Sequence, residues 1–159
     1  MSSPAALTCL SCAIVSGQRE TIGGVVAETS RFHAHQDIAY PVPGLVIVAA
    51  KRHFVALDEM DAVETTELVP FLQTVRRAQR RVLKSEHTYY FYNEDTRHHF
   101  HVWMVPRLDW MRPFGKSVES LRPALQHAAA TMSDENALTR LATTVRALRD
   151  AIDALRTGA

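Results

Sequence analysis

The stretch from His98 to Arg107 constrains the fold more than any other part of the chain. It reads His-His-Phe-His-Val-Trp-Met-Val-Pro-Arg, and alternation with period two predicts a β-strand. The side chains expected to enter a hydrophobic core fall on one face: Phe100, Val102 and Met104. The opposite face carries His99, His101 and Trp103. Two imidazoles two residues apart on one strand face lie close enough to act on one phosphate or to bind one metal ion.

The rest of the sequence predicts further strands around one long helix. Apolar and β-branched runs indicate strands over 25–29, 31–37, 45–50 and 88–93. Helical periodicity extends over 61–84, where Pro70 either kinks the helix or begins a second one. Strands followed by a helix and then by more strands predict an antiparallel α+β domain.

The C-terminal part differs in character, so we expect a domain over residues 1–113 and a C-terminal helical extension over 114–159. A helix is expected over 117–132, with Pro123 as a point of interruption, followed by Ser133 as the N-cap of a last helix. Apolar residues of that helix repeat with heptad-like spacing: Leu138, Leu141, Val145, Leu148, Ile152 and Leu155. The helix either packs on its own domain, which its short length favours, or pairs with a second copy of the chain.

The histidine strand resembles the signature of the histidine-triad superfamily, His-x-His-x-His followed by apolar residues and often by Val-Pro-Arg. Counted back from Arg107, the three histidine positions fall at His99, His101 and Trp103, so tryptophan replaces the third histidine. The resemblance covers roughly residues 9 to 107. It implies a five-stranded antiparallel sheet flanked by helices, a homodimer, and a protein similar to the dinucleoside polyphosphate hydrolase branch.

The resemblance also implies an activity. His101 would attack the α-phosphorus of a nucleotide, forming a covalent nucleotidyl-histidine that water or another acceptor resolves. The residues expected to bind the substrate are Asn93, Thr96, Trp103, Gln36 and Glu28. Trp103 donates a hydrogen bond through its indole N–H but cannot relay a proton. Gln36 stands where some relatives have histidine, and His33 or His35 would fill that position only after a local shift.

Cys9 and Cys12 form a Cys-x-x-Cys pair, which on its own is also compatible with two reduced thiols. In histidine-triad relatives that carry this pair, the other ligands of a structural zinc ion correspond to His53 and His99. All four residues are present here, so we expect zinc on Cys9, Cys12, His53 and His99.

Composition excludes several classes of partner. The formal net charge of +1, with 18 basic and 17 acidic residues, gives no general attraction for a nucleic-acid polymer or an anionic membrane. The apolar run from Ala5 to Val15 follows no Lys or Arg and is too short to span a bilayer, so we expect a cytoplasmic protein. Two other functions compete with the enzyme: a nucleotide-binding protein with weak turnover, and a zinc-organised dimeric interaction module.

Overall fold

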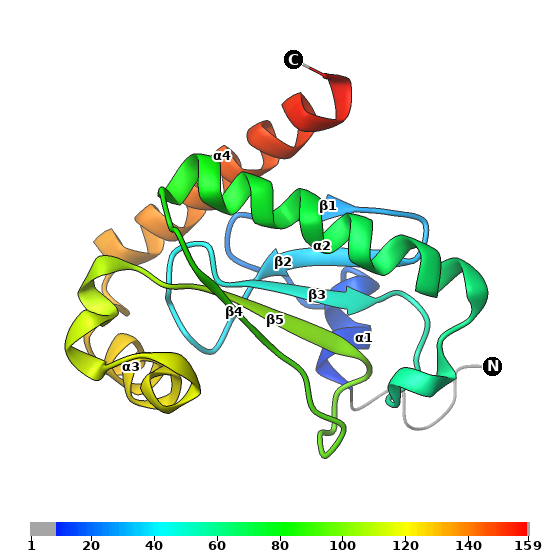
Figure 1. Cartoon of the computed structure of the whole chain (residues 1–159), viewed down its shortest axis with the longest axis horizontal. Helices are drawn as coiled ribbons and strands as arrows, with labels where there is room; N and C mark the ends of the chain where they lie inside the picture. The colour runs from blue at the N-terminus through cyan, green and yellow to red at the C-terminus, as the bar shows by residue number, and fades with distance from the viewer. Residues whose placement is uncertain (1–8, 159) are drawn as a thin grey trace.

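A five-stranded antiparallel sheet, in the order β1-β2-β3-β5-β4, forms the centre of the computed structural model, which describes residues 9–158 (Figure 1). Its strands are β1 (Val25–Glu28), β2 (Phe32–Gln36), β3 (Val46–Ala50), β4 (Thr88–Phe91) and β5 (His101–Pro106). The predicted α+β fold is therefore confirmed. The histidine strand β5 lies inside the sheet, between β3 and β4.

Helices cover the sheet on both sides. They are α1 (Leu10–Val15), α2 (Ala62–Leu83), α3 (Ser117–Thr131) and α4 (Glu135–Thr157), with short 3-10 turns η2 (Leu57–Glu59) and η3 (Asp109–Phe114). Pro70 and Pro123 lie on exposed faces of continuous helices, so neither interrupts its helix. The predicted cap Ser133 is wrong, because Asp134 caps α4 by accepting a hydrogen bond of 2.7 Å from the Ala137 N–H. A carboxylate at the N-cap satisfies an amide that the helix itself leaves free.

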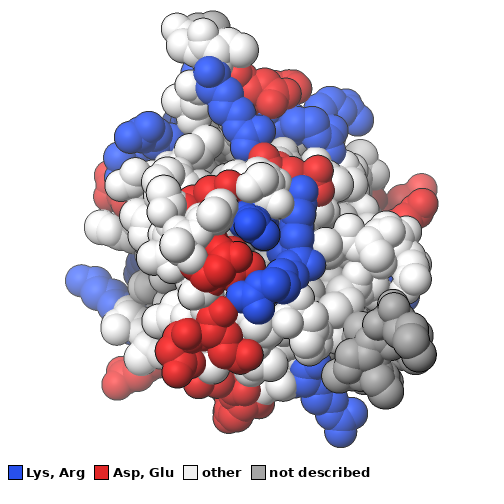
Figure 2. All heavy atoms as spheres, turned by 90° about the vertical axis from the view of Figure 1, so that its right-hand side faces the viewer, with Lys and Arg blue, Asp and Glu red and all other residues white. Residues whose placement is uncertain are grey.

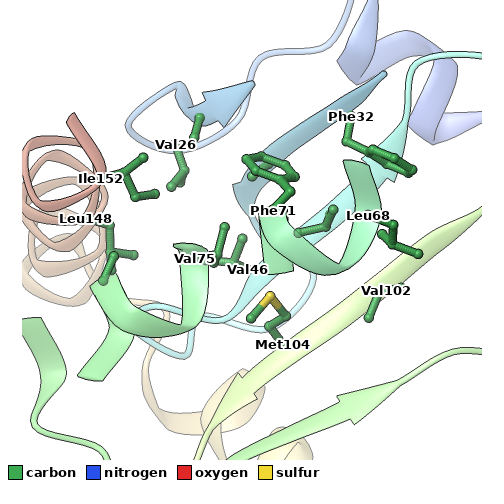
Figure 3. Close-up of a cluster of buried hydrophobic side chains, with 14 of the residues drawn as sticks. Val26, Phe32, Val46, Leu68, Phe71, Val75, Val102, Met104, Leu148 and Ile152 are labelled. Atoms are coloured by element: carbon green, nitrogen blue, oxygen red, sulfur yellow. The ribbon is translucent and has the colours of Figure 1, made fainter. Parts of the chain in front are cut away.

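The main core lies between the sheet and the helices α2 and α4, which lie above the strands in Figure 1. Figure 3 shows Phe71 and Val75 of α2 directed at Val46 and Met104, with Leu148 and Ile152 of α4 beside Val26. The predicted apolar face of the histidine strand therefore enters this core. In the apolar repeat of α4, Val145, Leu148 and Ile152 are buried in the same core and Leu155 packs against it half-buried, whereas Leu138 is 41% exposed. This helix therefore packs on its own chain.

The opposite face of the sheet carries the histidines. Strand register places His33, Ala49 and His101 in one row across β2, β3 and β5. His35 and Trp103 lie in the next row, on either side of Ile47. In Figure 1 α1 and α3 lie below the strands, and residues from both pack on this face. Both helices therefore cover parts of the histidine face.

The loop after β2 is fixed by two buried glutamines. Gln36 donates to the Val42 carbonyl at 2.9 Å and accepts from the Gly44 N–H at 3.1 Å. Gln79 of α2 donates to the Gly44 carbonyl at 2.9 Å. Gly44 has a φ of +77°, and a Cβ there would lie 2.4 Å from Leu83 Cδ1, so only glycine fits without rearrangement.

The surface carries both signs of charge. On the face shown in Figure 2, Lys and Arg side chains are interspersed with Asp and Glu side chains, in keeping with a net charge of +1. Among the described residues, no helix combines the length and the apolar character needed to cross a bilayer.

Candidate active site and metal-ligand cluster

A cavity of about 110 Å³ opens beside His101 on the histidine face of the sheet. Leu10, Ser11 and Ile14 of α1 form one wall of it. Trp103 lines it from β5, and its indole centroid lies 6.5 Å from that of the His101 ring. The helix α1 thus brings the start of the described chain to the predicted catalytic histidine.

Hydrogen bonding defines the protonation state of His101. Its Nδ1 lies 2.9 Å from the backbone carbonyl oxygen of His99. A carbonyl only accepts, so Nδ1 must carry the hydrogen, and in the neutral ring Nε2 keeps the lone pair that a nucleophile needs. Burial lowers the pKa of His101, outweighing the opposing effect of this hydrogen bond, and so favours the neutral ring. The site therefore presents a neutral imidazole with a defined tautomer.

Three further residues line this cavity: His35, which the sequence offered as a substitute at the Gln36 position, and Asp37 and His98, to which it gave no role in catalysis or binding. Asp37 accepts hydrogen bonds from the backbone N–H groups of Ala39 and Tyr40, at 3.0 and 2.7 Å. Burial raises the pKa of Asp37, against the effect of these bonds. The signal for Asp37 was available, because it follows β2 directly and precedes a Pro-Gly turn.

His35 is joined to a second buried histidine. The Nδ1 atoms of His33 and His35 lie 3.3 Å apart, and His33 Nε2 lies 4.0 Å from a carboxylate oxygen of Glu28. Burial, followed by the charges of nearby histidines, lowers the pKa of His35 to about 3. A proton on His35 is therefore strongly disfavoured, and the ring offers a hydrogen-bonding atom to the cavity without a charge.

Several residues predicted to bind substrate lie outside this cavity. Asn93 and Thr96 are half-buried on the turn before β5, where Asn93 donates to Asp95 and Thr96 accepts from the His98 N–H. Glu28 lies at the far end of the His101 row and pairs with Lys51 at 3.6 Å. Their predicted roles remain untested by the geometry.

The side chain of Gln36 is turned toward the loop that follows β2, and its role in substrate binding stays a prediction. The sequence placed it among the substrate-binding residues, but its side chain is fully buried and bonded to the backbone of Val42 and Gly44. It has no exposed atom to offer a ligand. The structure gives Gln36 the task of holding the loop that follows β2.

The predicted metal ligands come together at the start of α1. The donor atoms of Cys9, Cys12, His53 and His99 all lie within 4.8 Å of one another. Cys12 Sγ lies 3.1 Å from His53 Nδ1 and 3.2 Å from His99 Nδ1, and Cys9 Sγ lies 3.7 Å from His99 Nδ1. Ordinary zinc bond lengths give a sulfur–nitrogen edge of about 3.6 Å in a tetrahedron. The donor set and its spacing therefore fit zinc.

The surroundings of this cluster also suit a metal ion. The backbone N–H of His99 donates to Cys9 Sγ at 3.2 Å, the kind of outer hydrogen bond that orients a thiolate ligand. Burial, followed by the nearby Cys9, raises the pKa of the Cys12 thiol to about 11. A metal ion binding here must therefore displace the thiol proton. Cys9 and His99 are buried, whereas His53 is exposed.

Solved structures share this architecture. A zinc-bound histidine triad family protein from Mycobacterium smegmatis is 24% identical, with a TM-score of 0.70, and the match covers 97% of this chain and 99% of that one. A hypothetical histidine triad nucleotide-binding protein from Sulfolobus tokodaii is 21% identical, with a TM-score of 0.68 and coverage of 93% and 94%. A HIT family hydrolase from Clostridium thermocellum is 18% identical, with a TM-score of 0.54 and coverage of 70% and 96%.

No family model and no curated protein sequence matches the chain. The shared architecture and the histidine face define the class: this is a histidine-triad fold. The chain therefore shares its fold with solved histidine-triad proteins, and Trp103 stands where the sequence resemblance places the third histidine.

Proposed function

We propose that the chain is a nucleotide hydrolase or nucleotidyltransferase that acts at an α-phosphate through a covalent intermediate on His101. The bond from His101 Nδ1 to the His99 carbonyl carries this proposal, because it leaves Nε2 unprotonated in a neutral ring beside a cavity. A rigid strand holds this nitrogen, which favours attack from a fixed direction. A dinucleoside polyphosphate is the substrate class that the family resemblance favours.

The reaction balances with water alone. The lone pair of Nε2 forms a bond to the α-phosphorus, and the leaving group departs with the electron pair of its bond to phosphorus, taking a proton from solvent. Water then attacks the phosphorus, releases a proton and returns His101 to its neutral state. Another acceptor in place of water would make the same step a transfer. Trp103 supplies no proton to the leaving group, because an indole N–H is not an acid near neutral pH.

The cavity also sets a condition for substrate binding. Its volume of about 110 Å³ lies below the roughly 300 Å³ at which small-molecule sites begin. A nucleotide therefore needs α1 to move outward, or needs part of the substrate to lie beyond the cavity. The helix begins next to Cys9 and includes Cys12, so a metal ion on these cysteines would restrain any movement of this wall.

Mass spectrometry after incubation with a panel of nucleotides tests the covalent step, with a nucleotidyl group expected on His101. His101→Ala should lower turnover by more than about 100-fold, roughly 2.7 kcal/mol of transition-state stabilisation. His87→Ala is the matched control, because His87 is 71% exposed and lies outside the cavity. Turnover by His101→Ala close to that of the control would refute the mechanism.

The other two functions predict different results. A nucleotide-binding protein with weak turnover would bind the panel without forming the adduct. An interaction module organised by zinc would bind none of the nucleotides. The unprotonated Nε2 of His101 beside the cavity favours the enzyme over both.

We further propose that Cys9, Cys12, His53 and His99 bind structural zinc. The ion would join α1 to the residues that precede β5 and so contribute folding free energy. Protein purified without added metal should contain about one zinc ion per chain. His53→Ala should lose this zinc while His87→Ala keeps it. Equal zinc content in the two variants, or no zinc in the wild-type protein, would remove the site.

A further inference from the structure

A second, larger groove is lined by Trp103 and does not include His101 among its lining residues. Its volume is about 410 Å³, within the range of small-molecule sites. Tyr40, Phe91 and Trp103 form one side of it, and α3 forms the other. Trp103 lines both this groove and the His101 cavity, so the two spaces share one side chain as a wall.

The aromatic side chains of the groove are arranged to receive a flat ring. The ring centroids of Tyr40 and Trp103 lie 5.8 Å apart, and those of Phe91 and Trp103 lie 6.4 Å apart at an angle of 86°. These separations are typical of aromatic clusters in which rings meet edge to face or offset. Phe91 is nevertheless 41% exposed, which leaves aromatic surface uncovered within reach of solvent.

The helix α3 completes the groove with an apolar floor and a polar rim. Leu121 and Leu125 are buried at its base, while Val118 is 65% exposed at its edge. Arg122 and Gln126 are exposed and lie on the rim. An apolar ligand would thus cover Val118 and Phe91 while any polar end remained in water.

The separation of the His101 and Trp103 rings indicates which part of a substrate lies against this groove. A phosphorus atom in line for attack lies about 3–3.5 Å from Nε2. The Trp103 ring centroid is 6.5 Å from the His101 ring centroid. Both lengths are only a few ångströms, so a substituent that leaves phosphorus on the Trp103 side comes into contact with its ring, whereas residues of α1, including Ile14, line another side of the cavity.

We infer that the groove of Tyr40, Phe91, Trp103 and α3 binds an aromatic leaving group joined to the phosphorus that His101 attacks. This inference rests on the proposed function for the position of that phosphorus. Trp103 is then a specificity-determining residue. It stands in place of a histidine that could carry a proton, and its indole ring forms a surface on which the leaving group packs.

Two nucleoside 5′-phosphoramidates test the inference, one made with phenethylamine and one with propylamine. Their leaving groups are amines of similar basicity and differ chiefly in the aromatic ring. Binding is measured by calorimetry on His101→Ala, which cannot form the covalent bond, and turnover is measured on the wild-type chain. The phenethyl conjugate should bind about tenfold more tightly, because it buries a ring that the propyl conjugate lacks.

Substitution of groove residues separates this cause from others. Adding Phe91→Ala to the His101→Ala background should reduce the preference to about threefold or less. Tyr90→Ala is the matched control: it removes the neighbouring aromatic residue of β4, which is 52% exposed and lines the surface beside α2 instead. The control should keep the full preference.

The outcomes are distinct. Equal affinity for the two conjugates, no binding of either, or a preference that survives Phe91→Ala would overturn the inference. A change in sedimentation on Phe91→Ala would assign the groove to a second copy of the chain and would also overturn it. A preference that depends on Phe91, with no turnover of either conjugate and no nucleotidyl adduct on His101 from any member of the nucleotide panel, would support the groove and refute the proposed function.

Discussion

Replacing Gln36 by alanine distinguishes a structural role from a substrate-binding one. The side chain is fully buried, and it makes one hydrogen bond to the Val42 carbonyl and one to the Gly44 N–H. Alanine would leave both backbone groups without these partners in a buried environment. Each orphaned group costs about 1–3 kcal/mol, so the variant should lose about 3 kcal/mol of stability. For a chain of this length, that loss lowers Tm by roughly 6–12 °C.

Urea unfolding followed by circular dichroism measures this loss, and a thermal scan checks the shift in Tm. Gln73→Ala is the matched control, because Gln73 is an exposed glutamine on α2. Its stability should stay within about 0.5 kcal/mol of the wild type. A Gln36→Ala protein as stable as this control, but with impaired nucleotide binding, would refute the structural role and restore the one inferred from sequence.

The other predictions concern the triad, the metal cluster, a buried ion pair and assembly. Trp103→His should raise the hydrolysis rate of at least one nucleotide, because imidazole can relay a proton and indole cannot; no gain across a broad panel would show that tryptophan suits a different leaving group. Chelation, or the double change Cys9→Ser and Cys12→Ser, should lower Tm more than it lowers the turnover rate of the protein that remains folded; a larger loss of rate would place the metal in the chemistry. Glu64 is fully buried and accepts hydrogen bonds of 2.9 and 2.7 Å from Arg52. These bonds lower the pKa of Glu64 below its ordinary 4.5. The pair therefore stabilises the fold above pH 4.5, and this contribution disappears as the pH falls through the lowered pKa. Arg52→Ala should therefore lower the free energy of unfolding by about 2 kcal/mol at pH 7, a figure already reduced for the 43% exposure of Arg52. Urea unfolding should give a smaller loss at pH 4, and an equal loss at both pH values would contradict this reasoning. Sedimentation should give about twice the chain mass of 17.8 kDa, and a monomer at micromolar concentration would remove the expected homodimer.

Local periodicity was sufficient to predict much of the fold. Alternation along β5 placed Val102 and Met104 in the core because every second side chain of a strand shares a face. The same rule did not predict where the strand starts: β5 begins at His101, three residues after the predicted start at His98. Pro70 illustrates a second limit. The apolar face of α2 packs on the sheet and keeps the helix continuous where intrinsic propensity predicts a break.

The candidate site was predictable in part, for a related reason. Cys-x-x-Cys spacing and the family resemblance named all four donors of the metal cluster, because ligand type and spacing are written in the sequence. The partners of Gln36 depend on the path of the loop from Asp37 to Leu45, which folds back on β2. No local sequence pattern predicts that this loop folds back on β2. The placement of His35 and Asp37 beside His101 likewise depends on pairing between distant strands.

His99 acts on its surroundings through two chemically separate groups. Its ring is one of the four donors of the Cys9, Cys12, His53 and His99 cluster, whereas its backbone carbonyl sets the tautomer of His101. Every amino acid at this position would provide the carbonyl, but few would provide a metal ligand. A substitution of His99 could therefore remove a donor of the Cys9, Cys12, His53 and His99 cluster without removing the carbonyl that sets the tautomer of His101. The ligand role of the His99 ring and the tautomer of His101 can therefore change independently, although both depend on the same residue.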